Sequence, residues 1–301
     1  MTELMITKQK TEGKNHTFLP VLGEKAMHGI FLLTACASIA AVILICVFLF
    51  VNGVPAILAI GPMKFLCGTV WRPGNNEFGI FPMIVGSLYV TAGAVIIGVP
   101  IGILAATAIA RFIPDAPCRV MKTAVSLMAG IPSVVYGFFG LVVLVPWIRD
   151  TFGGRGLSVL TASVLLGIMI LPTVIVQSEA SIRAVPSSYY EGSLALGATH
   201  ERSVYKVVLP AARSGIFAGI ILAIGRALGE TMAVIMVAGN QPVVPESVLD
   251  GVRTLTTNIV MDMGYATDLH RGALIATAVV LFVFIMIINL SFSLMKRRGT
   301  R

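Results

Sequence analysis

Arg226 and Glu230 are the residues best placed for chemistry, because both fall inside an otherwise apolar stretch of the chain. A charge at the centre of a bilayer costs about 2.5–3.5 kcal/mol on insertion scales, so such residues usually face a protein interior or a water-filled path. Their spacing of four residues puts them one turn apart on one helix face, which predicts that they pair. Gly215, Gly219 and Leu222 share that face, and small residues favour helix packing. We expect the face to point into a helix bundle.

The chemistry of the predicted pair suits an oxyanion. Arginine presents planar, permanently charged donors, and Glu230 would neutralise Arg226 when no anion is bound. The alternative is a structural ion pair that only fixes the orientation of the helix. Four hydroxyl side chains are further candidate donors to an anion, although each is more often a helix-packing residue: Ser133, Tyr136, Thr173 and Thr231.

Catalytic and metal-binding motifs are absent from the sequence. No Gly-x4-Gly-Lys-Ser/Thr loop occurs, so the chain is not expected to hydrolyse ATP by itself. The spans hold no Ser/His/Asp cluster, HExxH helix or paired carboxylates, which argues against an intramembrane enzyme. The four cysteines show no metal-ligand spacing. We expect no catalytic residue, no metal site and no cofactor in this chain.

The composition is that of a polytopic membrane protein of the all-α class. Hydrophobic residues make up 56% of the 301 residues and charged residues only 12%, and the mean hydropathy is +0.92. Six apolar runs are long enough for a spanning helix. They predict spans near 28–51, 82–109, 121–147, 157–178, 213–239 and 272–295. Prolines at 100, 132 and 172 should bend three of them.

Lysine and arginine predict the orientation. Fifteen of these residues lie in the two tails and the even-numbered loops, against six on the other side, which puts both termini in the cytoplasm. The same asymmetry accounts for the net charge of +8, so no nucleic-acid partner is needed to explain it. Membrane lipid is expected to surround the spans. The organisation predicted is a cytoplasmic tail (1–27), the first span (28–51), an extracytoplasmic loop (52–81), a five-helix core (82–295) with a cytoplasmic loop (179–212), and a second tail (296–301).

The loop 179–212 is longer than a simple connection requires, and it carries helix signals. Ser188 and Glu191 fit a capping box at the start of a short helix that should stop at Gly197. Thr199 fits the cap of a second short helix that ends before Pro210. Two short helices with a glycine hinge would form a projecting knob.

This loop resembles the EAA loop of ABC importer permeases, Glu-Ala-Ala-x3-Gly-x9-Ile-x-Leu-Pro, with the same spacing. Small residues stand in place of the two alanines, and Val207 stands in place of isoleucine. The resemblance implies a type I ABC-importer permease fold and a loop that docks on a separate ATPase. The residues it assigns to that coupling are Glu191, Gly192, Ser193, Ala195, Gly197, Leu209 and Pro210.

Four further segments resemble phosphate permeases of the PstC type: residues 65–71, 129–137, 225–233 and 268–274. The resemblance implies a second permease subunit of PstA type, a dimer of PstB-type ATPases that binds the ATP and Mg, and an extracytoplasmic phosphate-binding protein. It also implies a role for Arg226 and Glu230 in phosphate passage. The outer segments 52–81, 148–156 and 240–271 are too short to capture a ligand alone, which also favours a binding protein.

Two alternatives remain. In the first alternative the chain is a permease for another oxyanion, such as phosphonate, sulfate or molybdate. In the second it is an ion-coupled secondary anion transporter that uses Arg226 and Glu230 as a relay. The predicted knob argues against the second alternative, because an ion-driven carrier has no ATPase to dock.

Overall fold

The computed structural model describes the backbone of residues 18–298 and the side chains of residues 27–291, so most of the two predicted tails lies outside the described residues. The helices, in chain order, are α1 (Phe18–Ile60), α2 (Pro62–Cys67), α3 (Phe81–Thr107), α4 (Asp115–Gly130), α5 (Ser133–Phe139), α6 (Val145–Phe152), α7 (Val159–Arg183), α8 (Ser187–Ala195), α9 (His200–Ser203), α10 (Leu209–Gly229), α11 (Met232–Val237), α12 (Leu255–Met263) and α13 (Asp268–Arg298). Single π-helical turns follow α3, α5 and α9 at Ala108–Phe112, Gly140–Leu144 and Val204–Val208, and Pro73–Asn75 forms a 3-10 turn.

The all-α class is confirmed, and so is the predicted number of spans, although the bounds of some spans differ. Among the described residues, six helical stretches are long and apolar enough to cross a membrane: Met27–Ile60, Phe81–Phe112, Ser133–Phe152, Val159–Arg183, His200–Gly229 and Asp268–Ser291. Within residues 18–298 one short β-hairpin accompanies the helices, in which β1 (Trp71–Arg72) pairs antiparallel with β2 (Glu77–Phe78). The first helix runs on to Ile60, beyond the predicted end of the span at residue 51.

The third span differs from its prediction of 121–147. Helix α4 ends at Gly130, Ile131 has an extended backbone with a ψ of 126°, and α5 starts after Pro132. The residue before a proline is pushed out of the helical conformation, which explains the break. The apolar run therefore covers two helices, and the candidate span begins at Ser133.

The fifth span is also interrupted. Helix α10 ends at Gly229, and Glu230 has an extended backbone with a ψ of 131° before the short helix α11. The predicted continuous helix over 213–239 is therefore wrong at Glu230.

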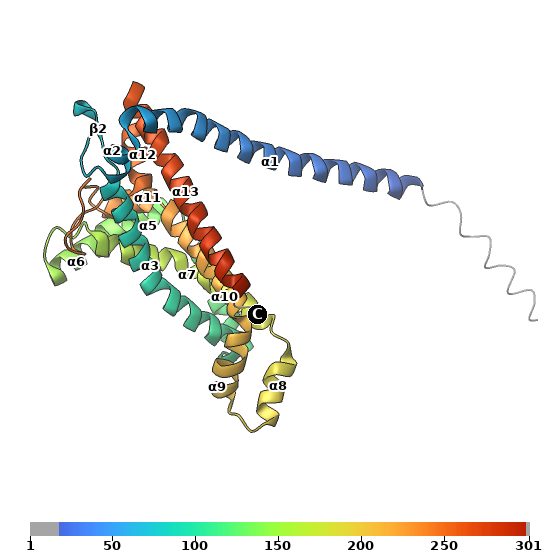
Figure 1. Cartoon of the computed structure of the whole chain (residues 1–301). Helices are drawn as coiled ribbons and strands as arrows, with labels where there is room; N and C mark the ends of the chain where they lie inside the picture. Colours follow the sequence, from blue (N-terminus) through green and yellow to red (C-terminus); the bar gives the residue numbers. More distant parts are fainter. Residues whose placement is uncertain (1–17, 299–301) are drawn as a thin grey trace, which may run out of the picture. The chain divides into compact units, whose positions relative to one another are not determined.

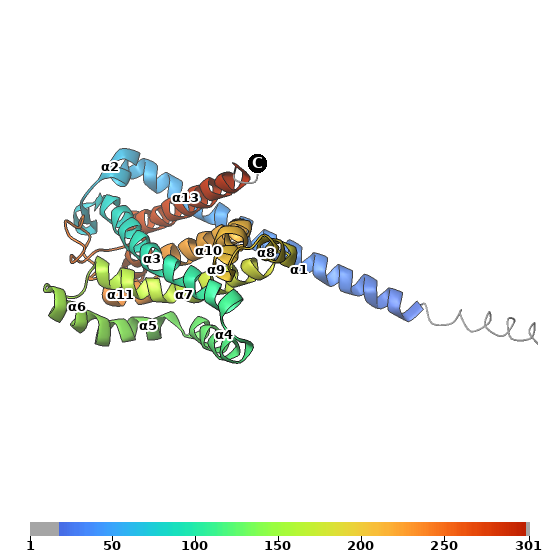
Figure 2. The ribbon, with the colours of Figure 1, turned by 90° about the horizontal axis from the view of Figure 1, so that it is seen from below.

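The centre of the bundle is the contact between α3 and α7, with α10 packed against both (Figures 1 and 2). Close approach requires a glycine here: a Cβ at Gly98 would lie 2.7 Å from the carbonyl oxygen of Gly167 and 2.8 Å from Ile170. Small residues let helix backbones approach in this way inside membranes.

Two groups of elements occupy opposite ends of this bundle. The hairpin β1–β2 lies with α2 and α12 at one end, called here the hairpin end, and α8 and α9 lie at the other (Figure 1). Phe65, Trp71, Phe78 and Leu274 are buried together in the core of the hairpin end. We call α8, α9 and the turn between them the knob.

Candidate functional site

The break after Gly229 separates the two charges that were expected to pair. The Glu230 carboxylate turns toward α11, where its Oε1 accepts hydrogen bonds from the backbone N–H groups of Thr231 at 3.2 Å and Ala233 at 3.3 Å. A negative charge is favourable at a helix N-terminus. Within residues 27–291 no ion pair joins Arg226 to Glu230. The predicted pair is therefore wrong, because the two residues are not on one continuous helix.

The glycine stripe on α10 packs as predicted, but only along part of the helix. A Cβ at Gly215 would collide with Ser181 of α7, and one at Gly219 would lie 2.8 Å from Gln177. A Cβ at Gly225 would meet nothing within 4 Å. This face of α10 is therefore covered by α7 at one end and uncovered toward the break.

Arg226 lies on the uncovered part of α10. Its side chain is exposed, and Leu222 one turn earlier is 60% exposed. A cavity of about 510 Å³ in this region is lined by Arg226, by Thr173 of α7 and by Asn289 of α13. The expectation that this face points into the bundle therefore fails at Arg226, since this chain alone does not cover it.

The remaining hydroxyl candidates are spread over two places. Tyr136 is buried, and its hydroxyl donates to the carbonyl of Met128 at 3.0 Å, which ties α5 to α4 across their break. Ser133 is the first residue of α5 and is half-buried. Thr231 donates to the carbonyl of Gly229 at 3.2 Å. Only Thr173 shares the cavity of Arg226.

The knob has two helices as expected, but its first cap is different. Helix α8 starts at Ser187 after Pro186, and no side chain caps it, so the predicted capping box of Ser188 and Glu191 is wrong. The expected stop is confirmed, because Gly197 has a φ of +84° just after the helix. That left-handed conformation penalises a Cβ.

The second helix of the knob also matches its prediction in part. The Thr199 side chain accepts a hydrogen bond from the backbone N–H of Arg202 at 3.3 Å, which confirms the predicted cap. The helix does not end before Pro210, however. It continues through the π-helical turn Val204–Val208 into α10, where a proline in the first turn is tolerated.

The residues that the resemblance assigns to ATPase coupling are mostly on the surface of the knob. Glu191, Gly192, Ala195, Gly197 and Pro210 are exposed, and Leu209 is half-buried. Ser193 is different, because its hydroxyl accepts a hydrogen bond from Ser203 at 3.0 Å and holds α8 against α9.

Aromatic and basic side chains hold the knob against the π-helical turn Ala108–Phe112, which follows α3. The Arg111 guanidinium lies 5.9 Å from the centre of the Tyr190 ring and donates to the carbonyl of Ile182 at 3.1 Å. The Tyr190 hydroxyl forms a 2.7 Å hydrogen bond with Nδ1 of His200, whose ring lies edge-on to Phe112 at 4.7 Å. These contacts join the knob to the ends of the neighbouring helices.

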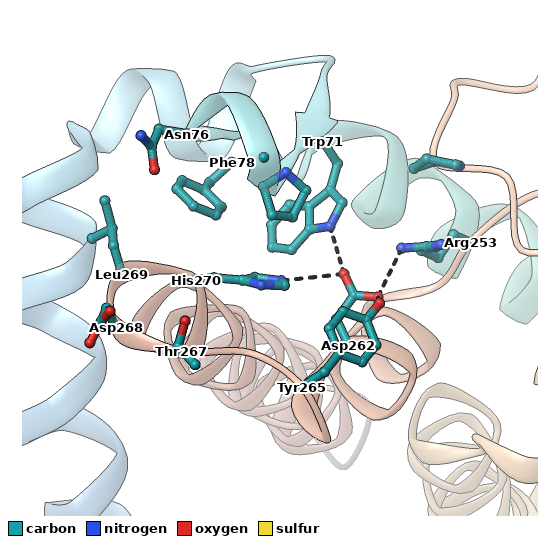
Figure 3. Close-up of a pocket in the computed structure, with 13 residues that line it drawn as sticks. Trp71, Asn76, Phe78, Arg253, Asp262, Tyr265, Thr267, Asp268, Leu269 and His270 are labelled. Atoms are coloured by element: carbon teal, nitrogen blue, oxygen red, sulfur yellow. Dashed lines mark hydrogen bonds and ion pairs between the residues drawn. The ribbon is translucent and has the colours of Figure 1, made fainter.

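A buried carboxylate at the hairpin end is a feature that the sequence did not reveal. Asp262 of α12 accepts hydrogen bonds from the Trp71 indole at 3.0 Å and from the Tyr265 hydroxyl at 2.7 Å. Its oxygens also lie 3.6 Å from Nη1 of Arg253 and 3.4 Å from Nε2 of His270. Figure 3 shows these side chains converging on Asp262. We call these five residues the Asp262 cluster.

The partners explain how a carboxylate that is 6% exposed is tolerated. A buried charge is costly unless it is paired and hydrogen-bonded, and here two donors and two basic groups surround it. The hydrogen bond to Asp262, together with burial, raises the pKa of Tyr265 above its ordinary value of 10.0. A cavity of about 670 Å³ opens beside the cluster.

His270 illustrates why sequence reasoning missed the cluster. It lies in the first turn of α13, far along the chain from its neighbours, yet its ring stacks on Phe78 at 6.0 Å and faces Asp262. Trp71 and Asp262 are 191 positions apart. No local spacing links them. Among the described residues, no three His, Cys, Asp or Glu side chains gather as metal ligands do.

Sequence relatives are ABC transporter permeases. The chain is 39% identical over 276 residues to the probable ABC transporter permease protein YqgH of Bacillus subtilis, covering 87% of this chain and 89% of that protein. It is 33% identical over 279 residues to the phosphate transport system permease protein PstC of Mesorhizobium japonicum, covering 85% of each.

Solved structures share the fold at lower identity. A bacterial alginate ABC transporter, in complex with an alginate-bound periplasmic protein, matches with a TM-score of 0.59 at 18% identity over 92% of this chain and 98% of that one. The MetNI methionine ABC transporter matches with a TM-score of 0.59 at 20% identity over 77% of this chain and 100% of the other. The family profile of the binding-protein-dependent transport system inner membrane component covers residues 98–301, and the chain belongs to this family of multi-pass, non-catalytic ABC importer permeases.

Proposed function

We propose that this chain is the permease subunit through which an ATP-driven importer moves inorganic phosphate into the cytoplasm. Membership of the family implies an ATPase and a binding protein as partners. The finer assignment is a PstA-type second permease, a PstB-type ATPase dimer carrying ATP and Mg, and a phosphate-binding protein on the outer side. We also propose that both termini lie in the cytoplasm, in keeping with the fifteen-to-six distribution of Lys and Arg.

The exposure of Arg226 is the observation that carries the proposal. It lies in a stretch that is apolar enough to span a membrane, and no acidic side chain among the described residues forms an ion pair with it. An arginine facing hydrocarbon is costly, so its guanidinium requires water, a partner subunit or an anion. A path for phosphate between two permease subunits meets that requirement.

The loss of the Glu230 pairing strengthens this argument. With Glu230 committed to the start of α11, the guanidinium of Arg226 keeps its planar donors for an external ligand. Thr173 and Asn289 line the same cavity and offer neutral hydrogen-bonding groups. A conduit must bind weakly enough to release its ion, and one arginine with neutral neighbours satisfies that condition.

Reconstitution with the partner subunits tests the substrate. ATP-dependent uptake of labelled phosphate is measured in proteoliposomes, with sulfate, molybdate and phosphonate as competitors. Phosphate uptake that only phosphate suppresses supports the proposal. Uptake of one of the other oxyanions instead, with none of phosphate, would refute it and leave the other-oxyanion alternative. Membership of the ABC importer permease family argues against the ion-coupled alternative.

Arg226 variants test the path. Arg226→Gln should abolish uptake while the complex still assembles, because this side chain makes no ion pair that holds the fold. Arg226→Lys should restore only part of it, because an ammonium lacks the planar two-point contact. Thr123→Val, at an exposed threonine on α4, serves as the control. Normal phosphate uptake by Arg226→Gln would show that Arg226 does not take part in phosphate passage.

The knob is proposed as the surface that docks on the ATPase. Its exposed Glu191 and Ala195 fit the EAA resemblance, and the Arg111–Tyr190 contact would pass motion to the helix ends. Gly197→Val should uncouple ATP hydrolysis from uptake, since a Cβ is penalised at a φ of +84° although no neighbour is near. Gly130→Val, at an open position without positive φ, is the matched control. Efficient coupled transport by Gly197→Val would count against this role.

A further inference from the structure

Helix α12 links the hairpin end to the break after Gly229. Its first residues are buried: Leu255 is 1% exposed, Thr256 7% and Asn258 0%. Its last turn carries Asp262 and thus the Asp262 cluster. A helix of nine residues spans about 13 Å, so a single rigid element reaches from the hairpin to the break.

One carbonyl at the break accepts a hydrogen bond from α12. Ending a helix inside a membrane leaves carbonyl groups without donors, and each unsatisfied group is costly there. The carbonyl of Gly229 is satisfied locally, by Thr231. The carbonyl of Glu230 instead accepts a hydrogen bond from the hydroxyl of Thr256, at 3.0 Å, from 26 residues further along the chain.

Several other bonds hold the start of α12 in place. The Thr254 side chain caps the helix, and the backbone N–H of Leu255 donates to the hydroxyl of Ser87 on α3 at 3.0 Å. Just before the helix, Arg253 donates to the carbonyl of Asn240 at 3.2 Å and to Asn258 at 3.1 Å. Arg253 also forms an ion pair with Asp262, so hydrogen bonds and an ion pair join the two ends of α12.

We infer that α12 is a strut whose Thr256 hydroxyl positions the broken backbone at Glu230, and whose Asp262 cluster fixes the strut to the hairpin end. The inference rests on the proposed function in one respect: a binding protein that docks on the hairpin end would act on the Arg226 region through this strut. Thr256 and Asp262 are positioning residues, which act on the path through the backbone of Glu230.

Thr256→Val removes the hydroxyl and keeps the shape of the side chain, and Thr256→Ser restores a hydroxyl. Thr277→Val is the matched control, because Thr277 is also buried but donates to the carbonyl of Ala273 in its own helix at 2.9 Å. In the reconstituted complex, stimulation of ATP hydrolysis by the binding protein should fall at least about fivefold in Thr256→Val, the effect of one acceptor left without a donor. It should stay within about twofold of wild type in Thr256→Ser and Thr277→Val.

A second measurement does not depend on the substrate. A single cysteine at Gly229, where a Cβ meets nothing within 4 Å, reports on the break through its rate of reaction with a water-soluble thiol reagent. The native cysteines are replaced in this background. Thr256→Val should change that rate at least about fivefold, and Asp262→Asn, at the far end of α12, should change it in the same direction. Thr277→Val should not.

The outcomes separate the two proposals. A wild-type complex that moves no phosphate, with a cysteine rate that still responds to Thr256→Val and Asp262→Asn, would refute the substrate and support the strut. Phosphate transport with a rate that responds to neither variant would refute the strut alone. A response to Thr256→Val without one to Asp262→Asn would also refute it, because the hydrogen bond would then act only locally. A Thr256→Val chain that fails to assemble leaves Asp262→Asn to decide.

Discussion

The geometry of Glu230 leads to a sharp prediction about the energetic coupling between the two intramembrane charges. Glu230→Ala removes an acceptor for the N–H groups of Thr231 and Ala233, at 3.2 and 3.3 Å. Loss of such a cap costs about 0.5–2 kcal/mol, and these two distances are long enough to favour about 1 kcal/mol. Glu230→Gln keeps an acceptor oxygen and loses only the charge at the helix N-terminus, which is worth about 0.3–1 kcal/mol.

An ion pair with Arg226 would behave differently. Removing one partner of a buried pair costs about 3–5 kcal/mol, and removing both restores much of it. Because the structure separates the two residues, Arg226→Gln and Glu230→Gln should add in the double variant within about 0.5 kcal/mol.

The assay is the melting temperature of each purified single and double variant in detergent, together with its abundance in the membrane. For a chain of this size about 1 kcal/mol corresponds to about 2–4 °C. Glu230→Ala should melt lowest of the Glu230 variants, and the double variant should show the sum of the two single shifts. An interaction energy above about 2 kcal/mol between Arg226→Gln and Glu230→Gln would refute the reasoning and restore the ion pair.

Three further predictions concern other parts of the structure. Gly137→Ala should destabilise the protein by about 1–3 kcal/mol, because its Cβ would lie 2.7 Å from Met236 Sδ and 3.0 Å from the backbone of Ala233. Gly130→Ala, at an open position, should not destabilise it, so equal melting temperatures for the two variants would contradict this prediction. Thr199→Ala should lose about 0.5–2 kcal/mol of local stability in the knob, seen as faster amide exchange over α9 that Thr199→Ser largely prevents. The tyrosinate absorbance of Tyr265, obtained by difference from Tyr265→Phe, should appear with a midpoint above pH 10.0, and the midpoint should shift downward in Asp262→Asn. The stability that this hydrogen bond contributes is complete below the ordinary pKa of tyrosine and is lost as the pH rises through the raised pKa. A midpoint below pH 10.0 would contradict the raised pKa.

Much of the fold could be predicted because its signals are local or depend on hydropathy. Apolar runs identified six spans, although proline at 132 moved the start of one of them. The knob was predicted from Gly197 and Thr199, whose left-handed turn and side-chain cap depend on only a few neighbouring residues. The capping box at Ser188 failed because Pro186 already sets where α8 begins.

The candidate site was predicted only in its residue types. Arg226 stood out because a charge in an apolar run is rare, but its exposure depends on how far α7 covers α10. A spacing of four residues predicts pairing only if the helix is continuous. The helix ends at Gly229, so the two residues do not meet that condition.

The sequence by itself determined that the chain spans a membrane and carries a knob, since both follow from the local preferences of residues for lipid, turns and caps. Only the tertiary structure decided where the fifth span breaks and which groups surround Asp262. The donor for the Glu230 carbonyl comes from Thr256, and Trp71 reaches Asp262 across 191 positions. The free energy of a freed carbonyl or a buried carboxylate depends on distant donors that packing brings near, and such distances are not encoded in any short stretch of sequence.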